Sequence, residues 1–161
     1  MTLKDFIIDP KDAQRILIGA SGTLGPMEFA QGLVAIVAAS IVMQLLGLVL
    51  GGLGGLWTLI NLIVGVFLAF CWICIFSKRF HDAGKSGWLA AAAAAAGIVG
   101  SIILSMILVP VFAGGAMMTA QSSPLGAMVM TPGMILANIL ISVIVNGALG
   151  YYMFRLPSKA V

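Results

Sequence analysis

The residues most able to do chemistry lie in one charged stretch between two apolar segments, from Lys78 to Trp88. This stretch holds the only histidine of the chain, His81, directly before Asp82. A histidine and a carboxylate can act together as a general acid and base. Neighbours in sequence need not face each other, and no nucleophile is evident beside them. Catalysis is therefore the least favoured of three interpretations of this stretch.

A structural turn between two helices is the interpretation that we favour. Cations such as Lys78 and Arg79 are stable at a helix C-terminus, and Asp82 can pair with Arg79 or accept backbone N–H groups in the turn. The remaining positions have equally ordinary roles: backbone freedom for Gly84 and Gly87, a helix cap for Ser86, and a membrane-interface position for Trp88.

Anion binding is the third interpretation. Lys85, Ser86 and the free N–H groups at the start of the following helix converge where lipid phosphates lie. Anionic lipid headgroups at Arg79 and Lys85 are therefore candidate partners.

Two sulfur-containing patterns are weaker candidates. Cys71 and Cys74 form a C-x-x-C inside an apolar run, where free cysteine behaves as a small hydrophobe and no third metal ligand is near. Soft thioethers can bind Cu(I), yet clustered methionines more often form an adaptable apolar surface. The methionines concerned are Met117, Met118, Met128 and Met130, followed by Met134. We expect neither a metal nor a cofactor.

Four amides lie well inside the apolar segments: Gln44, Asn61, Asn138 and Asn146. Polar groups in a membrane either hydrogen-bond between helices or line a transport path. Gln44 and Asn61 lie at matching depths on consecutive helices, roughly 8–9 Å below their outer ends at 1.5 Å per residue. We therefore predict a hydrogen bond between these two residues, and amides that seal a bundle rather than line a pore.

The composition indicates which elements must position these residues. Of the 161 residues, 61% are hydrophobic and 8% are charged, whereas soluble domains have about 45–50% apolar and about 25% charged residues. Only a lipid environment suits so much apolar surface. The net charge of +3 comes without a Lys/Arg run of the kind that binds nucleic acid, so we expect no nucleic acid partner.

Four stretches are long enough to span a bilayer as helices. They are Phe29–Leu50, Leu56–Phe76, Trp88–Val109 and Met134–Phe154. The breaks between them are a Gly51–Gly55 turn, the charged loop Ser77–Gly87, and Pro110, which we expect to end the third helix. Residues 1–28 are expected to form a cytoplasmic segment with a short surface helix, residues 29–154 the transmembrane domain, and residues 155–161 a cytoplasmic tail.

The basic residues predict the orientation. All 8 Lys and Arg residues fall in the N-terminal segment, the charged loop or the C-terminal tail. Basic residues concentrate in cytoplasmic loops. Both termini are therefore expected in the cytoplasm.

The pattern Arg79-x-His81-Asp82-x-Gly84-x-Ser86-Gly87-Trp88 resembles the signature of the bacterial inner-membrane family named domain of unknown function 805. Glu28-Phe29 resembles the family's start of the first helix, although Leu24, Gly25 and Met27 replace its basic residues. The family's usual Asn- and Gly-rich tail is absent. The resemblance implies a small four-helix inner-membrane protein with this motif after the second helix, and it implies no settled activity.

These observations predict an all-α protein, a four-transmembrane-helix bundle with a short cytoplasmic N-terminal surface helix. The expected function is non-enzymatic: a structural or accessory subunit that packs against another integral membrane protein. A ridge of small residues, Ala93, Gly97, Ser101 and Ser105, is one candidate contact surface. The alternatives are a small transporter or channel lined by the Asn and Gln side chains, and a membrane enzyme that uses His81 and Asp82.

Overall fold

The computed structural model describes residues 10–19, 21–113 and 131–158 of the chain, and this part is all-α. The helices are α1 (Pro10–Leu17), α2 (Pro26–Leu50), α3 (Gly55–Asp82), α4 (Leu89–Ala113) and α6 (Pro132–Phe154), with a short 3₁₀ turn, η2, at Gly51–Leu53. The last 4 of these α-helices are long and apolar enough to cross a membrane. The predicted four-helix membrane fold is thereby confirmed.

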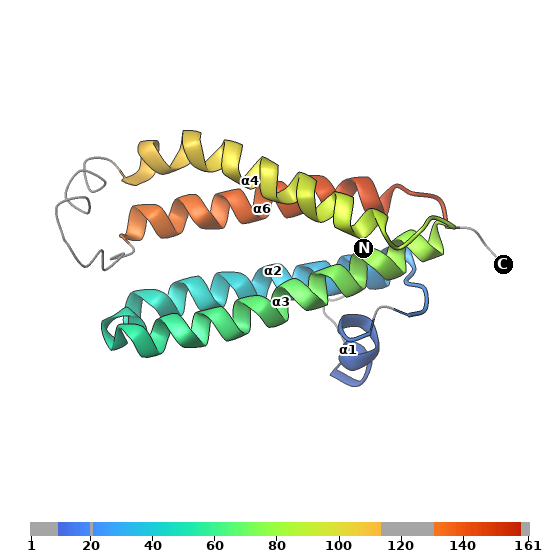
Figure 1. The fold of residues 1–161 in the computed structure, drawn as a ribbon, viewed down its shortest axis with the longest axis horizontal. Helices are drawn as coiled ribbons and strands as arrows, with labels where there is room; N and C mark the ends of the chain where they lie inside the picture. The colour runs from blue at the N-terminus through green and yellow to red at the C-terminus, as the bar shows by residue number, and fades with distance from the viewer. Residues whose placement is uncertain (1–9, 20, 114–130, 159–161) are drawn as a thin grey trace.

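The four long helices form two antiparallel pairs. η2 joins α2 to α3, and α4 lies beside α6 (Figure 1). Contacts run from α2 to α3, α4, α6 and back to α2, so the helices close into a ring. The two pairs lie close together at the end that carries α1 and diverge toward the end that carries η2 (Figure 1).

The buried core lies where the pairs meet. Phe29 of α2 meets Phe76 of α3 edge-on, with ring centroids 5.1 Å apart, and Trp72 stacks on Phe76 at 3.7 Å. Ile16 of α1 and Met153 of α6 belong to the same cluster, each 1% exposed. The core therefore ties all the surrounding elements together at one end of the bundle.

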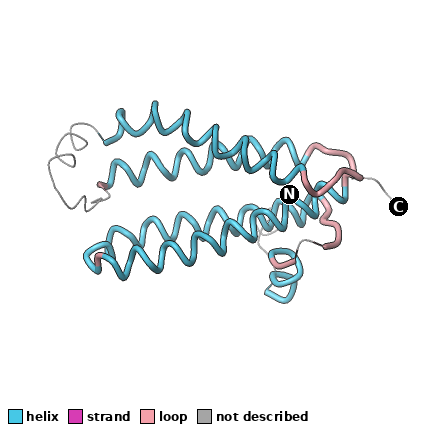
Figure 2. Tube along the Cα trace, viewed as in Figure 1, coloured by secondary structure: helices cyan, strands magenta, loops and turns pink. Residues whose placement is uncertain are grey.

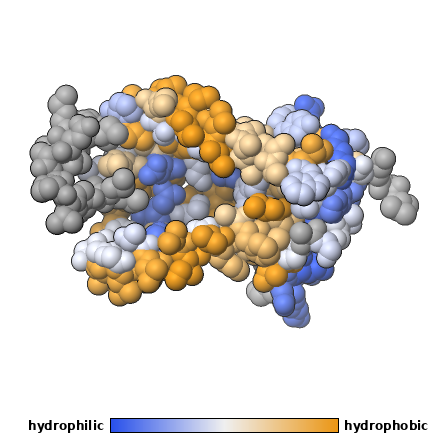
Figure 3. All heavy atoms as spheres, viewed as in Figure 1, coloured by the Kyte–Doolittle hydropathy of each residue, from blue (hydrophilic) through white to orange (hydrophobic). Residues whose placement is uncertain are grey.

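Polar and apolar surfaces are separated along the bundle. On the face shown, hydrophobic residues cover much of the helices, while hydrophilic residues gather at the end with α1 (Figure 3). The loops after α1, α3 and α6 lie at that same end (Figure 2). Apolar faces along the helices suit contact with lipid.

The structure corrects the predicted end of the second transmembrane helix. We predicted its end at Phe76 and a charged loop over Ser77–Gly87, but α3 continues to Asp82. Its last turn remains helical because the charged side chains there find partners on other segments, as described below. Only the residues after Asp82 form the loop.

Prolines account for three further differences between the predicted and the observed helix bounds. Pro110 lies inside α4, which runs on to Ala113, so the prediction that it ends this helix is wrong. A proline removes only one N–H from the helix, and transmembrane helices tolerate this loss. α2 and α6 begin earlier than predicted because Pro26 and Pro132 occupy their first turns, a position that suits proline.

The methionine-rich segment cannot be placed on this fold. Met117, Met118, Met128 and Met130 lie outside the described residues, whereas Met134 is on α6.

Glycines allow close approach where the helix pairs meet. A Cβ at Gly150 of α6 would collide with the Leu33 side chain of α2. At Gly32 of α2 it would lie 3.0 Å from Ile16 Cγ2. Small residues at these crossings let membrane helices pack backbone to backbone.

Candidate functional site

The last turns of α3 place two consecutive cations in the interior of the protein. Lys78 is 4% exposed and Arg79 is 0% exposed. Successive residues on an α-helix point about 100° apart, at 3.6 residues per turn. The two side chains therefore reach different neighbours.

Lys78 holds the end of α1. Its Nζ donates to the backbone carbonyl of Arg15, and to those of Ile16 and Ile18 at 3.2 Å each. The last carbonyls of a helix lack intrahelical partners and carry partial negative charge. Lys78 therefore caps the C-terminus of α1 and fixes this helix against α3.

Arg79 does the same for α6. Its Nε donates to the Met153 carbonyl at 3.1 Å, and its Nη2 donates to the carbonyls of Phe154 and Leu156. These carbonyls belong to the end of α6 and the residues just after it. Arg79 therefore caps α6, as Lys78 caps α1.

The Nη1 group of the Arg79 guanidinium binds side chains. Nη1 donates to the Asp82 carboxylate and, at 3.1 Å, to Ser158 Oγ, and this hydroxyl in turn donates to Asp82. The pairing of Arg79 with Asp82 agrees with the structural interpretation. Since Arg79 is wholly buried and has partners on all three nitrogens, it presents no surface to a lipid headgroup.

The loop after α3 is a glycine-terminated turn. Gly84 has φ +67°, its N–H donates to the His81 carbonyl at 2.9 Å, and the Lys85 N–H donates to the Phe80 carbonyl at 2.8 Å. This pair of bonds with a left-handed glycine is the Schellman ending of a helix. It directs the chain back toward α4.

Ser86 lies in the turn before the next helix. Its carbonyl accepts from the Leu89 N–H at 3.1 Å, and its Oγ accepts from the Trp88 N–H at 3.4 Å. Both bonds lie in the turn that leads into α4, whose first residue is Leu89, so the helix cap expected at Ser86 stays a prediction. Trp88 is 85% exposed at this helix start.

Gly87 is required by its surroundings rather than by its backbone angles. A Cβ at Gly87 would lie 2.6 Å from both His81 Nε2 and Ser77 Oγ. The imidazole of His81 therefore packs against the loop backbone. The Asp82 carboxylate is engaged by Arg79 and Ser158, and no hydrogen bond joins it to His81 among the described residues.

A surface ion pair accompanies the Lys78 contact. Arg15 Nη2 pairs with Glu28 Oε1, and Glu28 Oε2 accepts from the Gly25 N–H at 3.4 Å. The hydrogen bond with Glu28 and its negative charge raise the pKa of Arg15. The Glu28-Phe29 pair thus joins the start of α2 to α1 through Glu28 and fills the core through Phe29.

The intramembrane amides differ in their roles. Asn146 Oδ1 of α6 accepts from Trp72 Nε1 of α3 at 2.9 Å, which is an interhelical bond, and Asn146 Nδ2 donates to the Ser142 carbonyl. Asn61 instead donates to the carbonyl of Trp57 on its own helix at 3.2 Å. Asn138 is half-buried on α6.

The predicted Gln44–Asn61 hydrogen bond does not form. Gln44 Oε1 is buried and has no partner within the described part of the chain. The Trp57 ring instead packs on α2 near this level, where a Cβ at Gly47 would lie 3.3 Å from Trp57 Nε1. A short amide such as Asn61 can satisfy itself on the carbonyl one turn earlier, so matching depth alone does not create a bond.

A cavity of about 550 Å³ lies between the four long helices. Its lining is mostly apolar, with four polar side chains: Ser40, Ser101, Ser142 and Asn146. Gly97 and Ser101 line this cavity, and Ala93 packs against the core. Most of the small-residue ridge on α4 therefore faces the bundle, contrary to its expected use as an outer contact surface.

Sequence reasoning missed two of the residues that organise this site. The sequence pattern gives Lys78 the same role as Arg79, a cation at a helix C-terminus, and places Ser158 only in the tail. The available signal was a lysine directly after an apolar run, because a charge drawn into the protein at that position needs a partner. In the described residues, no group of three or more His, Cys, Asp or Glu side chains could hold a metal ion, and Cys71 and Cys74 are free and buried.

Comparisons with known proteins give one match. The family model described as "Protein of unknown function (DUF805)" matches residues 18–121. No curated protein and no solved structure matches the chain. The matched range includes α2, α3, α4 and the whole Arg79–Trp88 pattern.

Proposed function

Since the chain belongs to the DUF805 family of proteins of unknown function, we propose its role from its geometry: a non-enzymatic structural or accessory subunit of the bacterial inner membrane, with both termini in the cytoplasm. The observation that carries this proposal is the internal use of the signature charges. Arg79 and Asp82, with the adjacent Lys78, hold α1 and the end of α6 to the bundle. The charged motif therefore holds segments together and does not form a reactive centre. We call Lys78, Arg79 and Asp82 together the clasp.

The catalytic alternative is disfavoured by the same contacts. A general acid–base pair needs both groups within hydrogen-bond reach of a substrate proton. The Asp82 carboxylate is committed to Arg79 and Ser158. His81 Nε2 lies against the Gly87 backbone instead.

The surface left for a partner is apolar and lies in the membrane. On α3, Leu62 and Val66 are each 63% exposed, and on α4, Ile103 and Ile107 are 54% and 57% exposed. Each pair is spaced by four residues and so shares one helix face. Such faces accept either lipid or the helix of another membrane protein.

Site-specific photocrosslinking distinguishes these occupants. We expect a photoreactive residue at Val66 or Ile103, in protein expressed at native level, to capture one membrane protein in stoichiometric amount from one of the two faces. A photoreactive residue at Ile75, which is 0% exposed, is the matched internal control. Capture of lipid alone from both faces would contradict the accessory role.

The central cavity favours a second candidate, a small transporter or channel. Its lining includes Ser142 and Asn146 on α6 and Ser40 on α2. Hydrophilic atoms are also visible between the helix pairs toward the η2 end (Figure 3). Purified protein in liposomes would test this candidate: solute or ion flux that Asn146→Leu abolishes would favour transport over the accessory role.

A further inference from the structure

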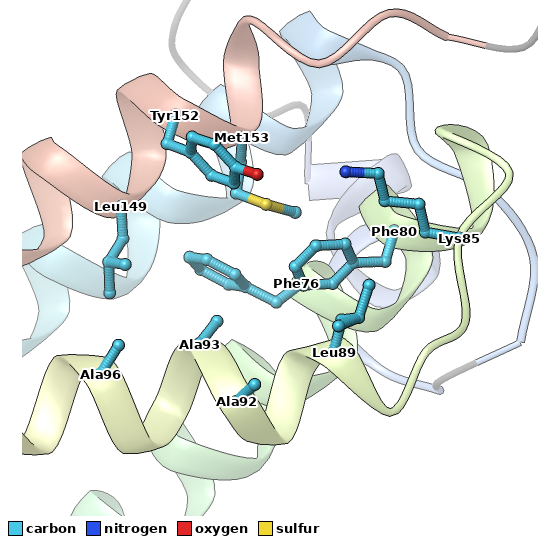
Figure 4. Close-up of a pocket in the computed structure, with 10 residues that line it drawn as sticks. All are labelled: Phe76, Phe80, Lys85, Leu89, Ala92, Ala93, Ala96, Leu149, Tyr152 and Met153. Carbon is cyan, nitrogen blue, oxygen red and sulfur yellow. The ribbon is translucent and has the colours of Figure 1, made fainter.

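A second pocket, of about 300 Å³, lies between α3, α4 and α6 beside the clasp. Its floor is apolar and comes from all three helices (Figure 4). The apolar lining residues are Phe76, Phe80, Leu89, Ala92, Ala93, Ala96, Leu149 and Met153. The pocket is many times larger than the space that one water molecule needs. It therefore has room for a segment of hydrocarbon chain.

The polar side chains of this pocket, Lys85 and Tyr152, lie at one end of it. Lys85 and Tyr152 approach from opposite walls, and the Lys85 Nζ and the Tyr152 hydroxyl point toward each other (Figure 4). Lys85 is in the loop after α3, and Tyr152 is near the end of α6. No ion pair joins Lys85 to a carboxylate in the residues that the structure describes.

This polar side lies at headgroup depth. α3 has 28 residues, which at 1.5 Å per residue makes it roughly 42 Å long, longer than the hydrocarbon core of about 30 Å. Its last turns therefore reach the interfacial region. Trp88, 85% exposed, and Tyr151, 62% exposed, lie at the same end, as expected for an aromatic belt.

We propose that this pocket binds one anionic phospholipid from the leaflet at this end of the bundle. The phosphate accepts hydrogen bonds from the Lys85 ammonium and the Tyr152 hydroxyl. An acyl chain lies along Phe76, Phe80 and the alanine face of α4. The site combines charge complementarity at the mouth with an apolar floor that water would solvate poorly. It does not depend on the accessory role, because the lipid can bind whether or not a protein partner does.

Native mass spectrometry of the full-length protein in detergent tests the headgroup half of this site. The probe is an equimolar mixture of phosphatidylglycerol and phosphatidylcholine with identical acyl chains. We expect the wild type to retain phosphatidylglycerol preferentially. Lys85→Gln should reduce that preference about five-fold, since one basic residue near a membrane surface is worth about 1 kcal/mol toward anionic lipid.

Matched variants control for loss of charge. Arg155→Gln removes a cation at the same end that does not line the pocket, so it should leave the preference unchanged. Lys85→Arg should keep it. Equal retention of the two lipids by the wild type, or the same loss in Lys85→Gln and Arg155→Gln, would overturn the proposal.

A second pair of variants tests the acyl-chain half. Ala96 lines the pocket and Ala95 does not, and both are exposed on α4. Ala96→Leu fills the pocket, so it should lower retention of phosphatidylglycerol, while Ala95→Leu should not. If Lys85→Gln lowers the preference but both leucine variants bind normally, the lipid is held at the surface by charge and the pocket is not its site. Unchanged thermal unfolding shows that each variant is folded.

Discussion

At the scale of single residues, Arg79 is the largest fully buried side chain of the described structure. It is fully buried, yet all three of its nitrogens donate to carbonyls, the Asp82 carboxylate or a hydroxyl. The planar guanidinium offers five N–H donors in a fixed arrangement, which a lysine ammonium cannot reproduce. Its role is therefore specific to arginine.

We expect Arg79→Met to destabilise the bundle strongly. The change leaves the Asp82 carboxylate and the carbonyls at the end of α6 without their donor, and breaking a buried pair costs about 3–5 kcal/mol. Thermal unfolding in detergent measures this loss. Arg155→Met removes an exposed cation whose only described contact is the Tyr151 ring, so it should cost less than about 1 kcal/mol. Equal effects of the two changes would contradict the assigned role of Arg79.

Gly87 supports a second prediction, because two side chains occupy the space that a Cβ at this position would need. Gly87→Ala places a Cβ against His81 Nε2 and Ser77 Oγ. Such overpacking typically costs about 1–3 kcal/mol. Adding Ser77→Ala and His81→Ala to the Gly87→Ala variant should restore most of the lost unfolding temperature. In the wild-type background, His81→Ala alone should change the unfolding temperature little. If the added changes restore nothing, backbone conformation rather than space requires this glycine.

At the scale of elements, α1 is attached to the bundle mainly through its C-terminus. Ile16 is buried in the core, Lys78 caps the last carbonyls, and Arg15 pairs with Glu28. A helix of 8 residues is too short to be stable in isolation, where about 12–15 residues are marginal. Its order therefore depends on these contacts.

We expect Lys78→Met to release α1 while α2, α3, α4 and α6 remain assembled. Hydrogen exchange over residues 10–18 should increase, because three carbonyls at the helix end lose their donor. Arg15→Gln is the comparison: its ion pair is exposed, and such pairs contribute about 0–1 kcal/mol. Unchanged exchange in Lys78→Met would show that Ile16 packing alone holds α1.

At the scale of the whole molecule, the cations of α3 and of the loop after it lie at one end and contact separate segments. Lys78 contacts the end of α1, Arg79 contacts the end of α6, and Lys85 shares a pocket with Tyr152. The tight turn η2 closes the opposite end without a basic residue. This distribution is the one that the positive-inside rule associates with a cytoplasmic α1 end.

Cysteine accessibility tests this orientation. In a background of Cys71→Ala and Cys74→Ala, Leu53→Cys in η2 should react with a membrane-impermeant maleimide in intact cells. Lys85→Cys should react only after the membrane is opened. Leu53 is 52% exposed, so a lack of reaction would not result from burial in the bundle. The reverse pattern would invert the proposed topology.

The sequence alone determined the number of membrane helices, their approximate positions, the N-terminal surface helix and the turn after Asp82, and it offered Arg79 as one of two partners for Asp82. These features are local: they follow from the length of apolar runs, from glycine and proline positions, and from neighbours three residues apart. Helix ends were less predictable. Apolar length alone suggested Phe76 as the end of α3, but buried partners keep the helix intact to Asp82.

Only the tertiary structure decided what the cations of α3 touch. Lys78 meets a carbonyl 63 positions earlier in the chain, and Arg79 meets one 77 positions later. Asn146 likewise bonds to Trp72, 74 positions away, while Asn61 bonds to its own helix. The physical reason is that a cation or amide accepts many partners of the same chemistry, and helix packing selects which carbonyl or indole comes within reach. Packing also turned the small-residue ridge of α4 inward, a choice that residue size leaves open.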